Sequence, residues 1–159
     1  MSGLVRLSGI ESGMITSISL LLQACKQKPM MLPLDLEDWL TEMGDQIVRK
    51  RASEGEAALT AREQLIYEIW ILDTEARNGG IPQYFANRGM KQWEQCTALV
   101  TAWPVPSFTL FAKRLSDLLI GNADPYLALI TREPEANELY YAYQIPIVTE
   151  LRQAVQTRD

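Results

Sequence analysis

The segment from Thr60 to Gly80 defines both ends of one helix and constrains the fold more than any other part of the chain. Thr60 and Glu63 have the spacing of a capping box, in which each side chain accepts a hydrogen bond from the other residue's amide. Gly79 predicts the helix end, because glycine readily adopts the left-handed conformation. Between these ends, apolar residues recur at helical spacing: Leu65, Ile66, Ile69, Trp70, Leu72 and Ala76.

Helical spacing continues on both sides of this segment. Asp35 is the expected N-cap of a preceding helix, and the polar stretch 53–56 predicts a turn after it. No sustained alternating pattern or hairpin dipeptide predicts a strand. We therefore expect an all-α, single compact domain of about six to eight helices. The further predicted helical segments are 35–52, a short one after Pro82, 91–103, 108–120, a short one after Asp124, and 135–159 with an interruption at Pro146.

Length and composition are those of a globular protein. The chain has 159 residues, of which 47% are hydrophobic and 22% charged. A chain of this length can bury roughly 70% of its unfolded surface, so it needs neither disulfides nor metal to be stable. We expect residues 33–159 to form the helical domain and residues 1–32 to be an N-terminal extension packed on it as a helix.

The sequence contains no histidine, and this excludes many kinds of active site. Ser-His-Asp and Cys-His catalysis and histidine-containing zinc sites are ruled out. Carboxylate chemistry, for example with Mg²⁺, stays open. Cys25 and Cys96 form no paired motif, so we expect two reduced thiols, and we expect no metal and no cofactor.

Acidic residues are concentrated in residues 33–75, which carry 11 acids and 4 bases, whereas residues 76–159 carry 8 of each. Direct nucleic-acid binding needs a basic surface, so we do not expect it. An acidic surface attracts a basic partner, although a solvated helix face explains the same acids more simply. The candidate partner-binding residues are Asp35, Glu37, Asp38, Glu42, Asp45, Glu54, Glu56, Glu63 and Glu68.

The N-terminal extension allows two interpretations. Ile15, Ile18, Leu22 and Cys25 recur at helical spacing and favour a packed amphipathic helix over residues 11–28. The alternative is a lipoprotein signal ending at Cys25, but an acidic residue near the start and a single preceding cation argue against it. The apolar run is too short to span a bilayer. We therefore expect a cytoplasmic protein.

A distinctive motif surrounds the two glycines. It combines a carboxylate and amides with apolar residues at a helix junction, where amides and carboxylates can satisfy unpaired backbone groups. The motif residues are Glu75, Asn78, Gly79, Gly80, Gln83, Tyr84, Phe85, Asn87 and Gly89. With Leu59, Thr60 and Glu63 upstream, this pattern resembles a bacterial family of largely uncharacterised helical proteins whose best-known member is a DNA mimic protein. The resemblance covers about residues 35–150.

The resemblance implies an acidic helical protein that occupies the DNA-binding surface of its protein partners. The acids needed for such mimicry are not part of the shared motif, so we interpret the motif itself as architecture. The leading hypothesis is a non-enzymatic protein that binds a basic protein, such as a DNA-binding protein, through residues 33–75. Alternatives are an immunity-type inhibitor, an enzyme that uses Glu75, Asn78 and Gln83, and a homodimerisation module.

Overall fold

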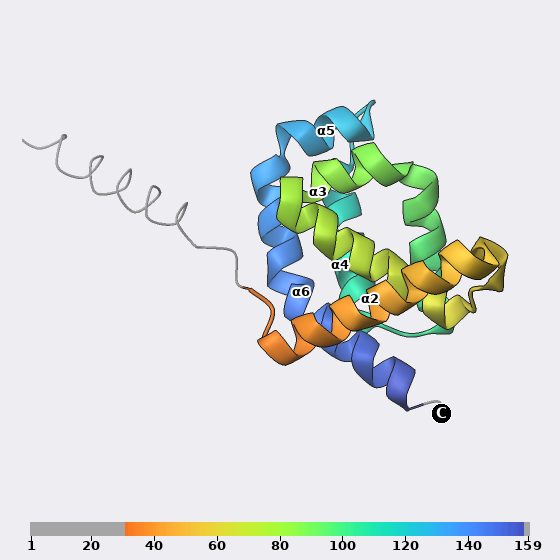
Figure 1. Ribbon diagram of the computed structural model, residues 1–159. Coiled ribbons are helices and arrows are strands. Elements are labelled where there is room, and N and C mark those ends of the chain that lie inside the picture. The colour runs from red at the N-terminus through yellow and green to blue at the C-terminus, as the bar shows by residue number, and fades with distance from the viewer. Residues whose placement is uncertain (1–30, 158–159) are drawn as a thin grey trace, which may run out of the picture. The chain divides into compact units, whose positions relative to one another are not determined.

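A computed structural model describes residues 31–157, and within these residues it contains five α-helices, one short 3-10 helix and no strand (Figure 1). The predicted all-α class is therefore confirmed. The expected helix over residues 11–28 and the signal ending at Cys25 lie outside the described residues. The elements are α2 (Leu34–Glu54), η1 (Glu56–Ala58), α3 (Ala61–Ala102), α4 (Pro106–Leu119), α5 (Pro125–Thr131) and α6 (Glu133–Gln156).

Helix α2 begins two residues earlier than an N-cap at Asp35 predicts. Its N-cap is Pro33, whose carbonyl accepts from the amides of Leu36 and Glu37, and no side chain caps the helix. The prediction that Asp35 is the N-cap is therefore wrong, because Asp35 already lies in the first helical turn. There its carboxylate favours the helix through the helix dipole. The predicted turn after α2 is present, with Gly55 at a φ of +89°.

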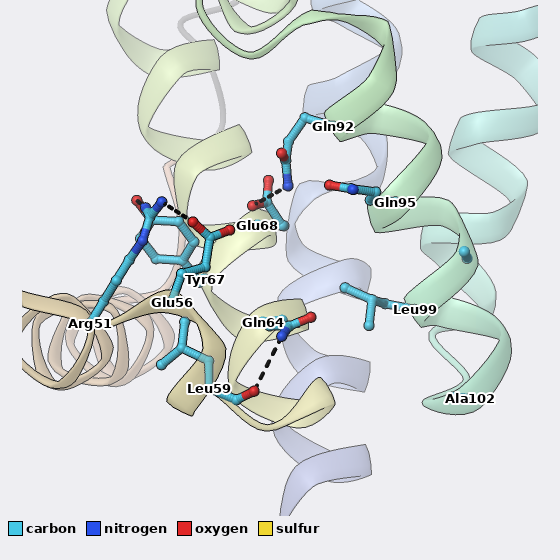
Figure 2. Close-up of a pocket in the computed structure, with 11 residues that line it drawn as sticks. Arg51, Glu56, Leu59, Gln64, Tyr67, Glu68, Gln92, Gln95, Leu99 and Ala102 are labelled. Carbon is cyan, nitrogen blue, oxygen red and sulfur yellow. Dashed lines mark hydrogen bonds and ion pairs between the residues drawn. The ribbon is translucent and has the colours of Figure 1, made fainter. Parts of the chain in front are cut away.

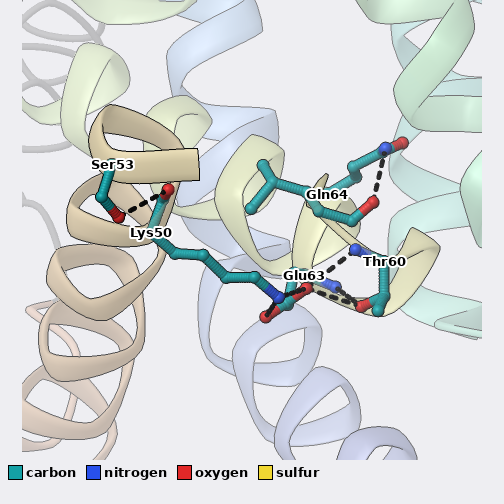
Figure 3. Close-up of polar contacts among 6 residues, drawn as sticks. Lys50, Ser53, Thr60, Glu63 and Gln64 are labelled. Carbon is teal, nitrogen blue, oxygen red and sulfur yellow. Dashed lines mark hydrogen bonds and ion pairs between the residues drawn. The ribbon is translucent and has the colours of Figure 1, made fainter. Parts of the chain in front are cut away.

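The predicted capping box begins α3 and also connects it to α2 (Figure 3). The Glu63 amide donates to the Thr60 hydroxyl at 3.2 Å, and the Thr60 amide donates to the Glu63 carboxylate at 2.8 Å. Lys50 of α2 forms an ion pair with the same carboxylate at 2.9 Å. Partial burial acts to raise the pKa of Glu63, but the hydrogen bonds from Thr60 and Lys50 outweigh it and leave the pKa below its usual value.

Two glycine breaks divide α3 into three arms, over residues 61–78, 81–88 and 90–102. Gly80 has a φ of +82° and Gly89 a φ of +76°. Gly79 was expected to supply the left-handed conformation, but its φ is −158°, so the left-handed residue lies one position later. In Figure 1 the three arms form an arch, and the short middle arm that follows Pro82 agrees with the prediction.

The first break lies close against α6. The amide of Ile81 donates to the Asn137 side-chain oxygen at 2.7 Å. A Cβ on Gly80 would come within 2.7 Å of the same Asn137 side chain, whereas a Cβ on Gly89 would meet nothing within 4 Å. The two glycines therefore share a backbone conformation but differ in their surroundings.

Helix α6 packs mainly on α3 and α4 and is continuous across Pro146. The predicted interruption at Pro146 is therefore wrong. A proline inside a helix leaves the carbonyl four residues earlier, here that of Ala142, without its usual donor. Because Ala142 and Pro146 are both exposed, water can satisfy that carbonyl. Cys96 is a buried free thiol in the core, as expected.

We expect Thr60→Ala to lower the free energy of unfolding by about 1 kcal/mol, because it removes the hydroxyl that accepts from the Glu63 amide. Chemical denaturation followed by circular dichroism measures this loss. Thr101→Ala, at an exposed position in the last arm of α3, is the control and should have little effect. A loss that is no larger for Thr60→Ala would contradict a stabilising capping box.

Replacing Gly80 with alanine should destabilise the protein more than replacing Gly89. Each alanine incurs about 1–2 kcal/mol of left-handed backbone strain. At Gly80 the new Cβ must also displace Asn137, which adds about 1 kcal/mol or more. Urea denaturation of both variants measures the two losses in free energy of unfolding, and the difference between them is the cost of displacing Asn137. Equal losses of stability would show that Asn137 moves away at no cost.

Candidate functional site

The polar residues of the glycine motif meet at the first break in α3. Glu75 lies before the break and Gln83 and Asn87 lie after it. The Glu75 carboxylate oxygen Oε2 accepts from Gln83 at 2.6 Å and from Asn87 at 2.9 Å. Asn78, in contrast, is exposed, and its side chain makes no hydrogen bond with any residue in 31–157. The motif thus supplies a carboxylate that joins two arms of α3.

The aromatic motif residues enter the core. Tyr84 is fully buried and Phe85 nearly so, and the two rings meet edge to face. Both contact Trp93 in the last arm of α3, which in turn contacts Phe108 and Phe111 of α4. Aromatic rings in these arrangements add to the stabilisation given by their burial. The middle arm of α3 is therefore anchored on α4 by its aromatic residues.

A buried polar cluster between α3 and α6 was not predicted. Asp73 is fully buried and accepts from the Tyr140 hydroxyl at 2.8 Å and from the Gln144 amide at 2.5 Å. Arg77 forms an ion pair with its second oxygen at 3.0 Å. Burial, followed by the nearby Asp73 charge, raises the pKa of Tyr140 well above its usual value. The sequence contained one sign of this cluster. Asp73 lies four residues after Ile69, which places an acidic residue at the helical spacing of the buried positions.

The structure separates the nine candidate acids into two groups. Five have a cationic partner within the chain, and Glu68 among these is buried. Their pairs are Asp35 with Arg152, Glu37 with Arg77, Glu56 with Arg51, Glu63 with Lys50, and Glu68 with Arg88. The other four are exposed, and no ion pair within residues 31–157 reaches them: Asp38, Glu42, Asp45 and Glu54.

Three of these exposed acids form a row on α2. Asp38, Glu42 and Asp45 are spaced four and three residues apart, which places them on one face of the helix. The row spans roughly 10 Å along the helix axis at 1.5 Å per residue. With Glu37, Gln46 and Arg49 among their neighbours, they line a shallow groove of about 480 Å³ whose lining residues all belong to α2. We call Asp38, Glu42 and Asp45 the acidic row.

Two features are absent from the described part of the chain. Among residues 31–157, no helix is long and apolar enough to cross a membrane. Within the same residues, no group of three or more cysteine or acidic side chains is arranged to hold a metal ion. The Glu75 carboxylate is instead directed towards the two amides described above.

Comparison with known proteins identifies a family. No curated protein and no solved structure matches the chain. The family model described as DMP19-like protein matches residues 57–144. This range contains the capping box, all three arms of α3, α4, α5 and the part of α6 that carries Asn137 and Tyr140. The matched range covers more than half of the sequence, and the chain therefore belongs to the DMP19-like family.

Proposed function

We propose that the protein is a non-enzymatic cytoplasmic protein that binds a basic protein through the acidic row on α2. Its partner is a DNA-binding protein, and the row occupies part of the surface that would otherwise hold a DNA backbone. The observation that carries this proposal is the surface charge of three neighbouring carboxylates that form no ion pair within residues 31–157. It steers a basic partner towards α2 and favours complementary contacts once the partner is bound.

The charge density of the acidic row approaches that of a DNA strand. One strand of a DNA duplex carries a negative charge every 3.4 Å along the helix axis. The row presents three charges over roughly 10 Å, because successive acids lie about one helical turn apart. Asp35 would continue the row by one turn, but its carboxylate is already paired with Arg152 at 3.2 Å. One DNA strand carries about four charges over the same length, so the row has a lower charge density than one backbone but a comparable one.

Membership of the DMP19-like family supports the same class of function, because the resemblance implies a protein that mimics DNA. The acidic row lies before residue 57, where the family match begins. On this proposal the shared range supplies the helical frame, and the chain's own α2 supplies the partner-specific charges. We assign the glycine motif to that frame, since Glu75, Gln83 and Asn87 are already occupied with one another.

Removing the acidic row should weaken competition with DNA. The triple variant Asp38→Asn/Glu42→Gln/Asp45→Asn removes three charges while leaving side-chain size almost unchanged. The assay measures release of a labelled duplex from a purified basic helix-turn-helix domain. We expect the wild-type protein to release the duplex at low salt, and the triple variant to be about tenfold weaker or worse. The effect of the wild-type protein should decrease as salt rises.

The matched control removes the same number of charges elsewhere. Glu94→Gln/Asp117→Asn/Glu138→Gln changes three exposed acids on α3, α4 and α6. This variant should compete as the wild-type protein does. Equal weakening of both triple variants would show that net charge acts without regard to position. Failure of the wild-type protein to release the duplex at any salt concentration would overturn the proposed mimicry.

A further inference from the structure

A pocket of about 480 Å³ lies between the first and last arms of α3, next to the end of α2 (Figure 2). Its size falls within the range of small-molecule sites. Figure 2 shows Glu68 and Gln64 from the first arm, with Gln92, Gln95 and Leu99 of the last arm opposite. The pocket shares no lining residue with the acidic row.

Glu68 is the most deeply buried polar residue that lines this pocket. Its side chain is 5% exposed, and its oxygen Oε1 accepts from Arg88 and from Gln92, each at 2.7 Å. The second oxygen, Oε2, is buried and has no hydrogen-bond partner among the described residues. An unsatisfied oxygen on a buried carboxylate is costly and is uncommon in native proteins. Glu68 is ion-paired with Arg88 through Oε1, so what it offers a ligand is the oxygen Oε2, for which the described residues supply no donor.

Two glutamine side chains add further acceptors. The Gln64 amide nitrogen donates to the Leu59 carbonyl at 3.2 Å, and the Gln92 amide nitrogen donates to Glu68 at 2.7 Å. Because a carbonyl and a carboxylate only accept hydrogen bonds, these contacts fix which end of each amide is the nitrogen. The oxygens of Gln64 and Gln92 are therefore directed away from these partners and are available to accept from a ligand.

Arg51, the cation that lines the pocket, makes its hydrogen bond and its ion pair with residues other than Glu68, Gln64 and Gln92. Arg51 donates to the Tyr67 hydroxyl at 2.8 Å and forms an ion pair with Glu56 at 2.7 Å. Apart from Gln95, the remaining lining is apolar and can contact a hydrocarbon chain. These apolar residues are Leu59, Ala98, Leu99 and Ala102.

We propose that this pocket binds an alkylguanidinium group, with the guanidinium donating to Glu68 and to the oxygens of Gln64 and Gln92 and the alkyl chain lying against Leu59 and Leu99. A guanidinium presents five N–H donors in a plane and is more weakly hydrated than an ammonium. It therefore suits a partly buried site that is rich in acceptors. The group can belong to a free small molecule or to an arginine side chain of another protein.

Burial raises the pKa of Glu68, against the opposing effect of Arg88. This direction agrees with a carboxylate that lacks full compensation for its desolvation. A bound cation would favour the charged form of Glu68. Binding should accordingly weaken as the pH falls and the carboxylate becomes protonated.

The test is titration of the full chain with n-butylguanidinium, followed by the side-chain amide signals of Gln64 and Gln92 in nuclear magnetic resonance spectra. Two probes separate charge from hydrogen bonding. Butyltrimethylammonium has the charge without N–H donors, and butylurea has N–H donors without the charge. We expect saturable shifts with butylguanidinium, and binding at least about tenfold weaker with either of the other probes.

Variants separate this pocket from the general acidity of the protein. Glu68→Gln should weaken butylguanidinium binding about tenfold or more, because it removes a charge-assisted hydrogen bond. Ala98→Trp should block the pocket from an exposed position on its wall without changing the core. Glu94→Gln removes a charge from the same arm of α3 outside the pocket lining and should leave binding unchanged.

A capped Gly-Arg-Gly peptide distinguishes the two sources of the group. Tighter binding of the peptide than of butylguanidinium identifies an arginine of a protein, and weaker binding identifies a small molecule. Absence of saturable shifts up to tens of millimolar butylguanidinium would overturn the proposal. An equal response to butyltrimethylammonium, or unchanged binding to a folded Ala98→Trp variant, would also overturn it. None of these outcomes depends on the acidic row.

Discussion

The close approach of α3 to α6 at Gly80 is the constraint on which the arrangement of the helices depends. The backbone at Gly80 is left-handed and leaves no space for a side chain, because Asn137 fills the position of a Cβ. Asn137 in turn accepts from the Ile81 amide, which is a backbone donor at the start of the middle arm. Steric fit and hydrogen bonding at one point therefore set the angle between two arms of α3.

The consequences of that angle extend to both sides of the break. The first arm carries Asp73 to the Tyr140 hydroxyl of α6, and the middle arm carries Tyr84 and Phe85 into the aromatic cluster with Trp93. The last arm then returns opposite the first, which places Gln92 at Glu68 and creates the pocket between them. A straight α3 could not bring Gln92 to Glu68, since the 24 residues between them would span about 36 Å.

Local features of the fold could be predicted from the sequence, because their causes lie within a few residues. The Thr60–Glu63 capping box and the short helix after Pro82 follow from neighbouring side chains alone. The wrong predictions concern competition with other interactions. Pro146 does not interrupt α6, because the packing of α6 on α3 and α4 outweighs one missing hydrogen bond at an exposed position. The positive φ lies at Gly80, which packs against Asn137, a residue distant in sequence whose contact the local pattern does not reveal.

The candidate sites were only partly predictable for a similar reason. Helical spacing alone places Asp38, Glu42 and Asp45 on one face, so the acidic row could be found before the structure. The ion pairs could not be predicted in this way. Glu37 reaches Arg77 through the packing of α2 on α3, and Glu56 reaches Arg51 across the turn after α2. Glu68 was grouped with the surface acids, yet it lies on the apolar stripe of its helix and is buried. An acid within such a stripe is a sign of burial that the charge count overlooks.

Arg77 connects the surface of α2 to the interior of the domain. Its guanidinium forms ion pairs with Glu37 of α2 and with the fully buried Asp73. Removing the cation would leave Asp73 charged in a medium of low polarity, with only neutral donors as compensation. Although Arg77 is exposed, the range of residues that evolution can accept there is set by a carboxylate that solvent never reaches. A surface position is thus under the selection that normally acts on a core.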